Sequence, residues 1–395
     1  MSKNECKQDC VMKKTSIGGQ ALIEGVMMRA GEDVAITCRD EGGKLHLVRE
    51  KNVPLRKKYK IFNLPLLRGI VNFIESLSLS MHSLNVSAEC YGGEIEEGRF
   101  EKWMKKHLGI GFYDIATAIG TVLGVLLSVG LFLYLPKLAV SGLEWLFATD
   151  FEKWAEGAIE GGLKVAIFVL YIFLVSLIPD IRRTFAYHGA EHKSIACYEA
   201  GEELTPENAK RYTRFHPRCG TSFIFVMLLL SILVSLGIRF LCEVVLSWDF
   251  AAWSIGVFGH NLSAVIYTLI GLVTLPLIVG IGFEFLMFAG KHNGPIIRVL
   301  SAPGIWMQRL TTREPDESQL AVAITALKCA MPEEFPDFDR ESYVIRDEYE
   351  NPPKKGDAEV KTEAPIEGSP VVEPSEEAAP EAEAPEAEAP EAEAP

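Results

Sequence analysis

Long apolar stretches dominate the middle of the chain. Four of them approach or exceed the ~20 residues that a helix needs to cross about 30 Å of hydrocarbon, and they cover residues 110–135, 162–179, 221–247 and 262–287. Each is apolar on all sides, whereas a soluble amphipathic helix confines its apolar residues to one stripe. The pattern predicts a mainly α, multi-pass helical membrane protein with about four transmembrane helices.

Basic residues flank these stretches on one side of the predicted bundle. Lys and Arg near the ends of spans are retained on the cytoplasmic side of a membrane. The basic clusters that precede the first and third stretches and follow the second and fourth are Lys102, Lys105 and Lys106; Arg211, Arg214 and Arg218; Arg182 and Arg183; and Lys291 and Arg298. The loops at 136–161 and 248–261 carry few basic residues. We therefore expect both termini and the loop at 180–220 to be cytoplasmic.

Residues 1–60 precede the apolar stretches and have the pattern of a small cytoplasmic β region. Apolar and polar residues alternate over 34–38 and again over 45–47, on either side of two glycines at 42–43. Alternation interrupted by a glycine pair is typical of a β-hairpin. We expect the segment at 21–29 to add a third strand.

Helical periodicity appears on both sides of the bundle at 110–290. In segment 61–109, apolar residues recur at helical spacing from Leu64 to Ser87 opposite a polar stripe, which predicts a helix that lies in the membrane interface or packs on the bundle. In segment 291–350, the sequence PDESQLAVAITALKCA begins with Pro and acidic residues and continues with helical spacing. This pattern predicts a short amphipathic helix.

The tail at 351–395 accounts for most of the chain's charge. It holds three Lys against thirteen Asp or Glu and so supplies −10 of the net charge of −14. It repeats Pro, Glu and Ala without large apolar side chains, so we expect a disordered acidic tail. The rest of the chain lacks the Lys/Arg excess of a nucleic-acid-binding protein, which excludes nucleic acid as the expected partner. The eight Cys residues form no C-x-x-C pair, so a disulfide framework is not indicated.

The loop at 180–220 collects the residues with the most distinctive chemistry. A helix over 180–200 puts His188 and His192 four residues apart on one face. His216 and Cys219 come just before the third apolar stretch, at a similar height above the bilayer. Imidazole and thiolate are natural zinc ligands, and two His at this spacing can hold one ion. These four residues are therefore the predicted metal ligands, with Zn²⁺ as the favoured divalent metal.

The same segment matches a catalytic pattern. His188-Gly-Ala-Glu191-His192 fits H-x-x-E-H, in which two His hold zinc and the Glu activates the bound water as general base. A catalytic zinc takes a third ligand and keeps an open position. The candidates for that third ligand are Glu199, His216, Cys219 and Glu284. The alternative is a juxtamembrane helix whose His residues bond neighbouring carboxylates or lipid headgroups.

Three further carboxylates are candidates for accessory roles, either supporting the metal ligands or acting in catalysis. Glu24 lies in SIGGQALIEGVMMR, Glu75 in LLRGIVNFIESL and Glu284 near the end of the fourth apolar stretch. For the first two, the alternative is a tight turn and an Arg–Glu salt bridge at a domain interface. For Glu284, it is an interfacial carboxylate paired with Lys291. His292 is a weaker candidate because loop histidines are usually solvated.

Five stretches give the chain a family resemblance: GGQALIEGVMMR, RGIVNFIESL, YHGAEHKSI, FHPRCGTSF and PGIWMQRLTTREP. With them, the chain resembles the YqhQ-like family of bacterial membrane proteins, known as domain of unknown function 1385, from Ile17 to Ala330. The resemblance implies a multi-pass protein of the bacterial plasma membrane and predicts a metal-dependent enzyme. It implies no substrate, and it leaves the tail outside.

These observations support two hypotheses of different classes. The first is a metal-dependent enzyme, a hydrolase that acts on a protein or lipid substrate at the cytoplasmic membrane interface, with Glu191 as its base. The second is a non-enzymatic membrane assembly or scaffold factor with a structural metal site or none, which a closed shell of four ligands would favour. A transporter is a weaker third reading, because no internal repeat is evident. The oligomeric state stays open.

Overall fold

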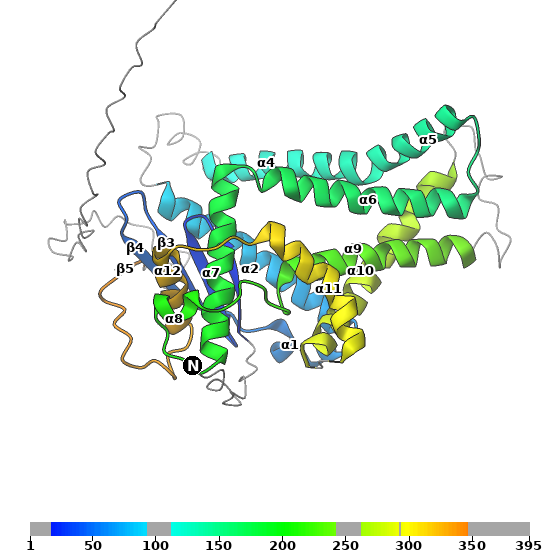
Figure 1. Cartoon of the computed structure of the whole chain (residues 1–395). Helices are drawn as coiled ribbons and strands as arrows, with labels where there is room; N and C mark the ends of the chain where they lie inside the picture. The colour runs from blue at the N-terminus through cyan, green and yellow to red at the C-terminus, as the bar shows by residue number, and fades with distance from the viewer. Residues whose placement is uncertain (1–16, 93–111, 242–261, 292–293, 347–395) are drawn as a thin grey trace, which may run out of the picture. The chain divides into compact units, whose positions relative to one another are not determined.

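A computed structural model describes residues 17–92, 112–241, 262–291 and 294–346, and these residues are mainly helical (Figure 1). Several expectations fall outside the described residues: the disordered tail at 351–395, the loop at 248–261, the cluster of Lys102, Lys105 and Lys106, and His292. The structure therefore leaves these expectations as predictions.

The N-terminal strands form an antiparallel meander. β1 (Ile17–Leu22), β2 (Gly25–Ala30), β3 (Asp33–Arg39) and β4 (Leu45–Lys51) pair in sequence order, and β5 (Val344–Ile345) adds to β4 in parallel. The hairpin expected from the alternation at 34–38 and 45–47 is confirmed as β3 and β4. The small β region is therefore present, and a C-terminal strand completes it.

The third strand expected at 21–29 is present as β2, but its bounds differ, because the end of β1 and a turn occupy the start of this segment. β1 ends at Leu22 and β2 begins at Gly25, and Glu24 in the turn has a φ of 47°. Gly25 is required there because a Cβ would lie 2.5 Å from the carbonyl oxygen of Thr37. The sequence hides this turn, since the left-handed conformation falls on Glu24 and not on a glycine.

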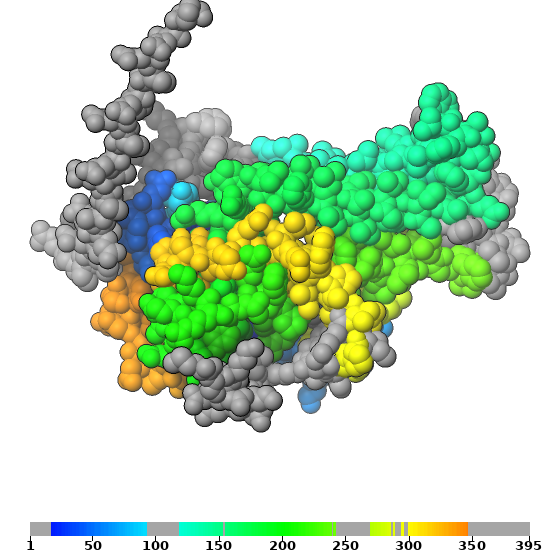
Figure 2. Space-filling view, viewed as in Figure 1, coloured from blue at the N-terminus to red at the C-terminus, as the bar shows by residue number. Residues whose placement is uncertain are grey.

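Helices cover both faces of the sheet (Figure 1). Side chains alternate along each strand, so Met28 and Ala35 pack with α7 (Pro179–Glu199) and α12 (Glu317–Cys329). Their neighbours on the other face, among them Met27, Val34 and Ile36, pack with α2 (Leu67–Tyr91). The two cores thus use opposite faces of the same strands. In Figure 2, α7 and α8 (Pro206–Lys210), both green, lie against the gold and orange C-terminal segments.

The two helices predicted beside the bundle are both present, but one differs in character. α2 packs on the sheet and on α10 (Leu262–Lys291). α12 begins with a capping box between Asp316 and Gln319, in line with the expected start. It is not amphipathic, because residues on nearly all its sides are buried between the sheet, α7 and α8.

Among the residues that the structure describes, three helices are long and apolar enough to cross a membrane: Ala118–Phe147, Ala155–Val175 and Gly220–Ile238. The first combines α4 (Phe112–Val129), the π-helix η2 (Gly130–Tyr134) and α5 (Leu135–Phe147); the others lie in α6 (Lys153–Val175) and α9 (Gly220–Phe240). In α10, the apolar stretch within the described residues is the shorter Leu269–Phe285. A fourth span therefore stays a prediction.

The boundaries of the first two apolar helices differ from the expected ones. The first continues past its expected end at 135 to Phe147, and the π-helix η2 directly precedes Pro136 at the point where the helix continues. The second runs earlier than the expected 162–179 and ends at Val175, after which Pro179 starts α7. Both shifts shorten the connection expected at 136–161.

Three further elements complete the described residues. α1 (Leu55–Lys58) and the 3₁₀ turn η1 (Lys60–Asn63) connect β4 to α2. α11 (Pro295–Thr311) packs on α9, where Gly304 allows close approach because a Cβ would lie 2.8 Å from the Cβ of Ser222. α11 thereby brings its C-terminal end next to α7 and the start of α9.

Candidate metal centre

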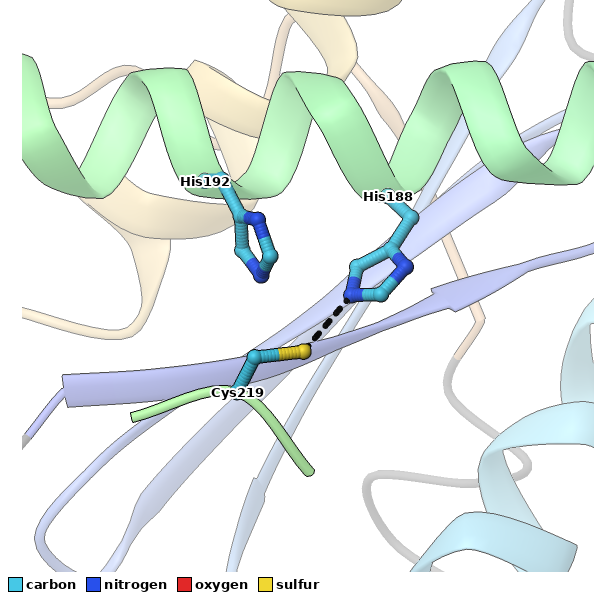
Figure 3. Close-up of side chains that lie close together, drawn as sticks. All are labelled: His188, His192 and Cys219. Atoms are coloured by element: carbon cyan, nitrogen blue, oxygen red, sulfur yellow. Dashed lines mark hydrogen bonds between the residues drawn. The ribbon is translucent and has the colours of Figure 1, made fainter. Parts of the chain in front are cut away.

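α7 presents the two histidines as the sequence predicts. The helix starts with Pro179 in its first turn and is followed by Gly201, whose φ of 73° is a left-handed conformation that suits glycine. His188 and His192 therefore lie one turn apart on the same face of a continuous helix. Figure 3 shows both imidazoles projecting from that face.

The chain that follows α11 holds α7 in place. The backbone N–H of Arg313 donates to the carbonyl oxygen of Phe185 at 2.8 Å. Gly189 is required at the crossing, because a Cβ there would collide with the carbonyl oxygen of Arg313. This close approach brings the last residue of α11, Thr311, beside His188.

Cys219 joins the two histidines to form the His188–His192–Cys219 cluster (Figure 3). All three side chains are buried, and one ligand atom from each lies within 4.8 Å of the others. The Nε2 of His188 is 3.2 Å from the Sγ of Cys219. Around a tetrahedral zinc ion, ordinary bond lengths separate a nitrogen and a sulfur ligand by roughly 3.5 Å. The spacing of this pair is therefore close to that of a zinc site.

Backbone carbonyls fix the orientation of both imidazoles. The Nδ1–H of His188 donates to the carbonyl oxygen of Thr311 at 2.8 Å, and that of His192 donates to the carbonyl oxygen of Arg214 at 2.5 Å. In the neutral form of each imidazole, Nε2 is then the ring atom with the free lone pair, as in histidines that bind metals. The Nε2 of His192 is buried and makes no hydrogen bond within the described residues.

Cys219 lies where a thiolate is favoured. It is the N-cap of α9, and its Sγ is 3.1 Å from the Oγ1 of Thr221. Burial by itself would raise the pKa of the thiol, but the adjacent His188 and His192 hold that pKa well below its ordinary value. A helix N-terminus favours the anion further.

The pKa of His188 is shifted in turn by its neighbours, among them Cys219. Burial would lower the pKa of its imidazole, but Cys219, Glu191 and the carbonyl oxygen of Thr311 together raise the pKa to about 9. Without a metal, the two residues therefore favour a thiolate–imidazolium pair. A bound metal requires the deprotonated forms of both. The site can thus support either metal binding or nucleophilic chemistry.

Glu191 lies on α7 between the two histidines in sequence but outside the cluster itself. Its side chain is buried against β1, and the backbone N–H of Gly19 donates to its carboxylate. Gly19 leaves room for it, because a Cβ would lie 2.9 Å from the Cδ of Glu191. Burial raises the pKa of this carboxyl, and its Oε2 makes no hydrogen bond within the described residues. These properties suit a general base.

His216 lies close to the cluster, but its partners differ. Its ring centroid is 5.4 Å from that of His192, and its Nε2 is 3.3 Å from the Nη2 of Arg218. Burial, together with His192 and Arg218, lowers the pKa of His216 to about 4. Arg218 also forms an ion pair with Glu199. In this arrangement His216 accepts from a guanidinium, and Glu199 is neutralised by the same group.

The accessory carboxylates are placed elsewhere. Glu24 forms an ion pair with Arg183 and accepts from the hydroxyl of Tyr187, so it ties the β1–β2 turn to α7. Glu75 accepts from the backbone N–H of Leu55 at the start of α1. Glu284 pairs with Arg68 of α2, and its expected pairing with Lys291 stays a prediction. These contacts are structural ties between elements.

Sequence patterns assign no role to Gln308, which is fully buried on α11. Its Oε1 accepts from the backbone N–H of His216 at 2.8 Å, and its Nε2 donates to the carbonyl oxygen of the same residue at 2.7 Å. It thereby fixes the backbone that leads to Cys219. Gln308 and Thr311 both lie in PGIWMQRLTTREP, the closing stretch of the family resemblance, which was the available signal.

Comparisons with known proteins agree with the resemblance. Residues 64–333 match a family model described as "Protein of unknown function (DUF1385)". The "Uncharacterized protein YqhQ" of Bacillus subtilis (strain 168) is 34% identical over 312 residues, which cover 78% of this chain and 89% of that protein. No solved structure matches the chain. The matched range includes every residue of the cluster, and the chain belongs to the DUF1385 family of proteins of unknown function.

Proposed function

We propose that this protein is a metal-dependent hydrolase of the bacterial plasma membrane, with zinc held by the His188–His192–Cys219 cluster and Glu191 as general base. The observation that carries the proposal is the buried, unbonded Nε2 of His192, which faces two further ligand atoms within 4.8 Å. A buried polar atom without a partner is costly, and a cation would satisfy it.

The set of donors fits a catalytic rather than a structural zinc site. Two imidazoles and one thiolate supply three protein ligands, whereas structural zinc sites are almost always closed by four. His216 is the nearest candidate for a fourth, but its Nε2 accepts from Arg218 in the described arrangement. The coordination position needed for a substrate or water therefore remains open.

The residues around the cluster have separate roles. A bound zinc ion would act as a Lewis acid and would lower the pKa of water. Thr311 and Arg214 hold the two imidazoles through their carbonyl oxygens. Glu191, whose pKa is raised by burial, accepts the proton of the attacking water and returns it to the leaving group. Because the three donors are buried, a substrate requires local opening to reach them.

The apolar helices support a membrane location for this chemistry. Cys219 immediately precedes the candidate span Gly220–Ile238, and α7 begins shortly after Ala155–Val175. The cluster therefore lies at the start of one apolar helix and on the helix α7 that follows another. Arg182, Arg183, Arg211, Arg214 and Arg218 lie at those same ends, which supports a cytoplasmic orientation.

The direct test compares Glu191→Gln with the wild type in detergent-purified full-length protein. We expect the variant to retain zinc and to lose hydrolysis by about 100-fold or more, as measured on a panel of ester, amide and phosphodiester substrates. Full activity in Glu191→Gln would contradict the assignment of the base. A wild type that binds no zinc after reconstitution would contradict the proposal as a whole.

X-ray absorption at the zinc edge separates the enzyme from the scaffold alternative. An enzyme site should show two imidazole nitrogens, one sulfur ligand and one oxygen ligand from exchangeable water. A shell of three nitrogens and one sulfur would mean that His216 turns away from Arg218 and closes the site. That result would favour a structural metal in a non-enzymatic assembly factor.

The spacing between His188 and Cys219 favours a second candidate function, a cysteine hydrolase. The 3.2 Å approach of Nε2 to Sγ, with Nδ1 held by the carbonyl of Thr311, is the arrangement of an activated thiol. This activity would survive chelators and be abolished by alkylation of Cys219. The zinc enzyme should show the reverse, because bound metal protects the thiolate from alkylation.

A further inference from the structure

The connection between β4 and α2 exposes large apolar side chains. It spans residues 53–67 and includes α1 and η1, and we refer to it as the β4–α2 connection. Ile61 is 61% exposed, Val53 55% and Leu64 52%, and Leu55, Tyr59 and Leu67 are also exposed. A soluble protein seldom exposes so many large apolar residues in one short segment, and such a patch marks an interaction surface.

The same segment carries a concentrated positive charge. From Lys51 to Ile74 the sequence holds six Lys or Arg and no Asp or Glu. Lys57, Lys58 and Lys60 are exposed, and Lys57 contacts Glu32 of the neighbouring turn at 2.5 Å. The ammonium of Lys58 lies 5.6 Å from the ring centroid of Tyr59. Basic and apolar side chains are thus exposed in the same short segment, as in segments that bind membrane surfaces.

Contacts with α10 fix the height of this connection relative to the apolar helices. Leu66, whose φ is 69°, abuts Gly280, where a Cβ would lie 3.0 Å from the Cα of Leu66. Arg68 pairs with Glu284. Both contacts fall near the end of the apolar stretch Leu269–Phe285. The exposed residues are therefore attached to the end of an apolar helix, where a bilayer would have its headgroups.

We propose that the β4–α2 connection is an anchor for anionic lipid headgroups at the bilayer surface. Arg56, Lys58 and Lys60 meet the phosphates, while Tyr59, Ile61 and Leu64 enter the boundary between headgroups and acyl chains. Basic residues bind anionic lipid in this way, and Tyr favours the same boundary. The anchor rests on the membrane location in the proposed function and is independent of the metal. It holds the sheet, and α7 that packs on the sheet, against the membrane.

Hydrogen–deuterium exchange of the full-length protein tests the anchor. The protein is reconstituted into nanodiscs of phosphatidylcholine alone or with added phosphatidylglycerol, and exchange is followed in peptides from 53–67. We expect anionic lipid to slow exchange there by about 10-fold or more, and high salt to reverse the effect. Inorganic phosphate added to phosphatidylcholine nanodiscs should give no protection, because it offers no boundary for the apolar residues.

Two variants with equal charge make the test specific. In the anchor variant, Arg56, Lys57, Lys58 and Lys60 are replaced by Gln; in the control, Lys44, Lys210, Lys328 and Lys355 are replaced by Gln. The anchor variant should exchange at the same rate in both lipids, and the control should behave like the wild type. Equal exchange of the wild type in both lipids, or equal loss in both variants, would overturn the anchor. Failure of the wild type to enter nanodiscs would overturn the membrane location as well.

Discussion

The buried cluster and the Arg–Glu pairs are both polar contacts between distant parts of the chain, but their bonding differs. In Arg183–Glu24 and Arg68–Glu284, both carboxylate oxygens accept from one guanidinium, so charge and hydrogen bonds are balanced. In the His188–His192–Cys219 cluster, carbonyls satisfy the outer ring nitrogens while the inner donor atoms face one another. A balanced pair is a structural tie, whereas convergent donors have the arrangement that a bound cation requires.

Of the changes that test this comparison, removal of a proposed ligand should have the largest effect on zinc affinity. We expect His192→Ala to weaken zinc binding by at least about 1000-fold, because its Nε2 is one of the three proposed ligands. Competition with a calibrated chelator measures the affinity. Glu284→Gln should change it less than about 3-fold, since that carboxylate belongs to a tie. Equal losses in the two variants would show that the cluster has no special role.

Loss of Gln308, which fixes the backbone beside the cluster, should have a smaller effect on zinc affinity. Gln308→Ala removes both hydrogen bonds to the backbone of His216 and should weaken zinc binding about 10- to 100-fold. The same chelator competition measures it. Arg309→Ala, an exposed neighbour on α11, is the control and should bind as the wild type does. Unchanged affinity in Gln308→Ala would mean that the position of Cys219 does not depend on α11.

A larger residue beside Glu191, the proposed base, should lower the stability of the fold more than it changes zinc binding. A Cβ at Gly19 would lie 2.6 Å from the carbonyl oxygen of Met27 and 2.9 Å from Glu191. Gly19→Ala should therefore lower the free energy of unfolding by about 1–3 kcal/mol, measured by thermal unfolding. Gly18→Ala is the matched control, because a Cβ at that position would meet nothing within 4 Å. A similar fall in both variants would place the strain in the strand and not against Glu191.

Breaking a tie should have the smallest effect. Arg183 is half exposed, so Glu24→Gln should cost about 1 kcal/mol or less of unfolding free energy and leave zinc content unchanged. Denaturant unfolding and elemental analysis measure the two quantities. A loss of zinc in this variant would give Glu24 a direct role at the metal and would remove the distinction between the two kinds of contact.

Local patterns in the sequence predicted the parts of the site that depend on local structure. The spacing of His188 and His192 follows from one helix, and Gly201 marks its end. Sequence spacing alone does not tell whether His216 or Cys219 lies with the two histidines of α7, because both are in one short segment. In the folded chain, Gln308 and Arg218 bond His216, whereas Cys219 lies with the two histidines of α7. The partner of Glu284 was missed for the same reason, since Arg68 is distant in sequence.

Elemental analysis of detergent-purified full-length protein tests the central claim most directly. The wild type, Glu24→Gln and a His188→Ala/His192→Ala double variant are compared after identical reconstitution and dialysis. The account predicts about one zinc ion per chain in the first two and none in the double variant. No metal in the wild type, or equal metal in all three, would contradict it.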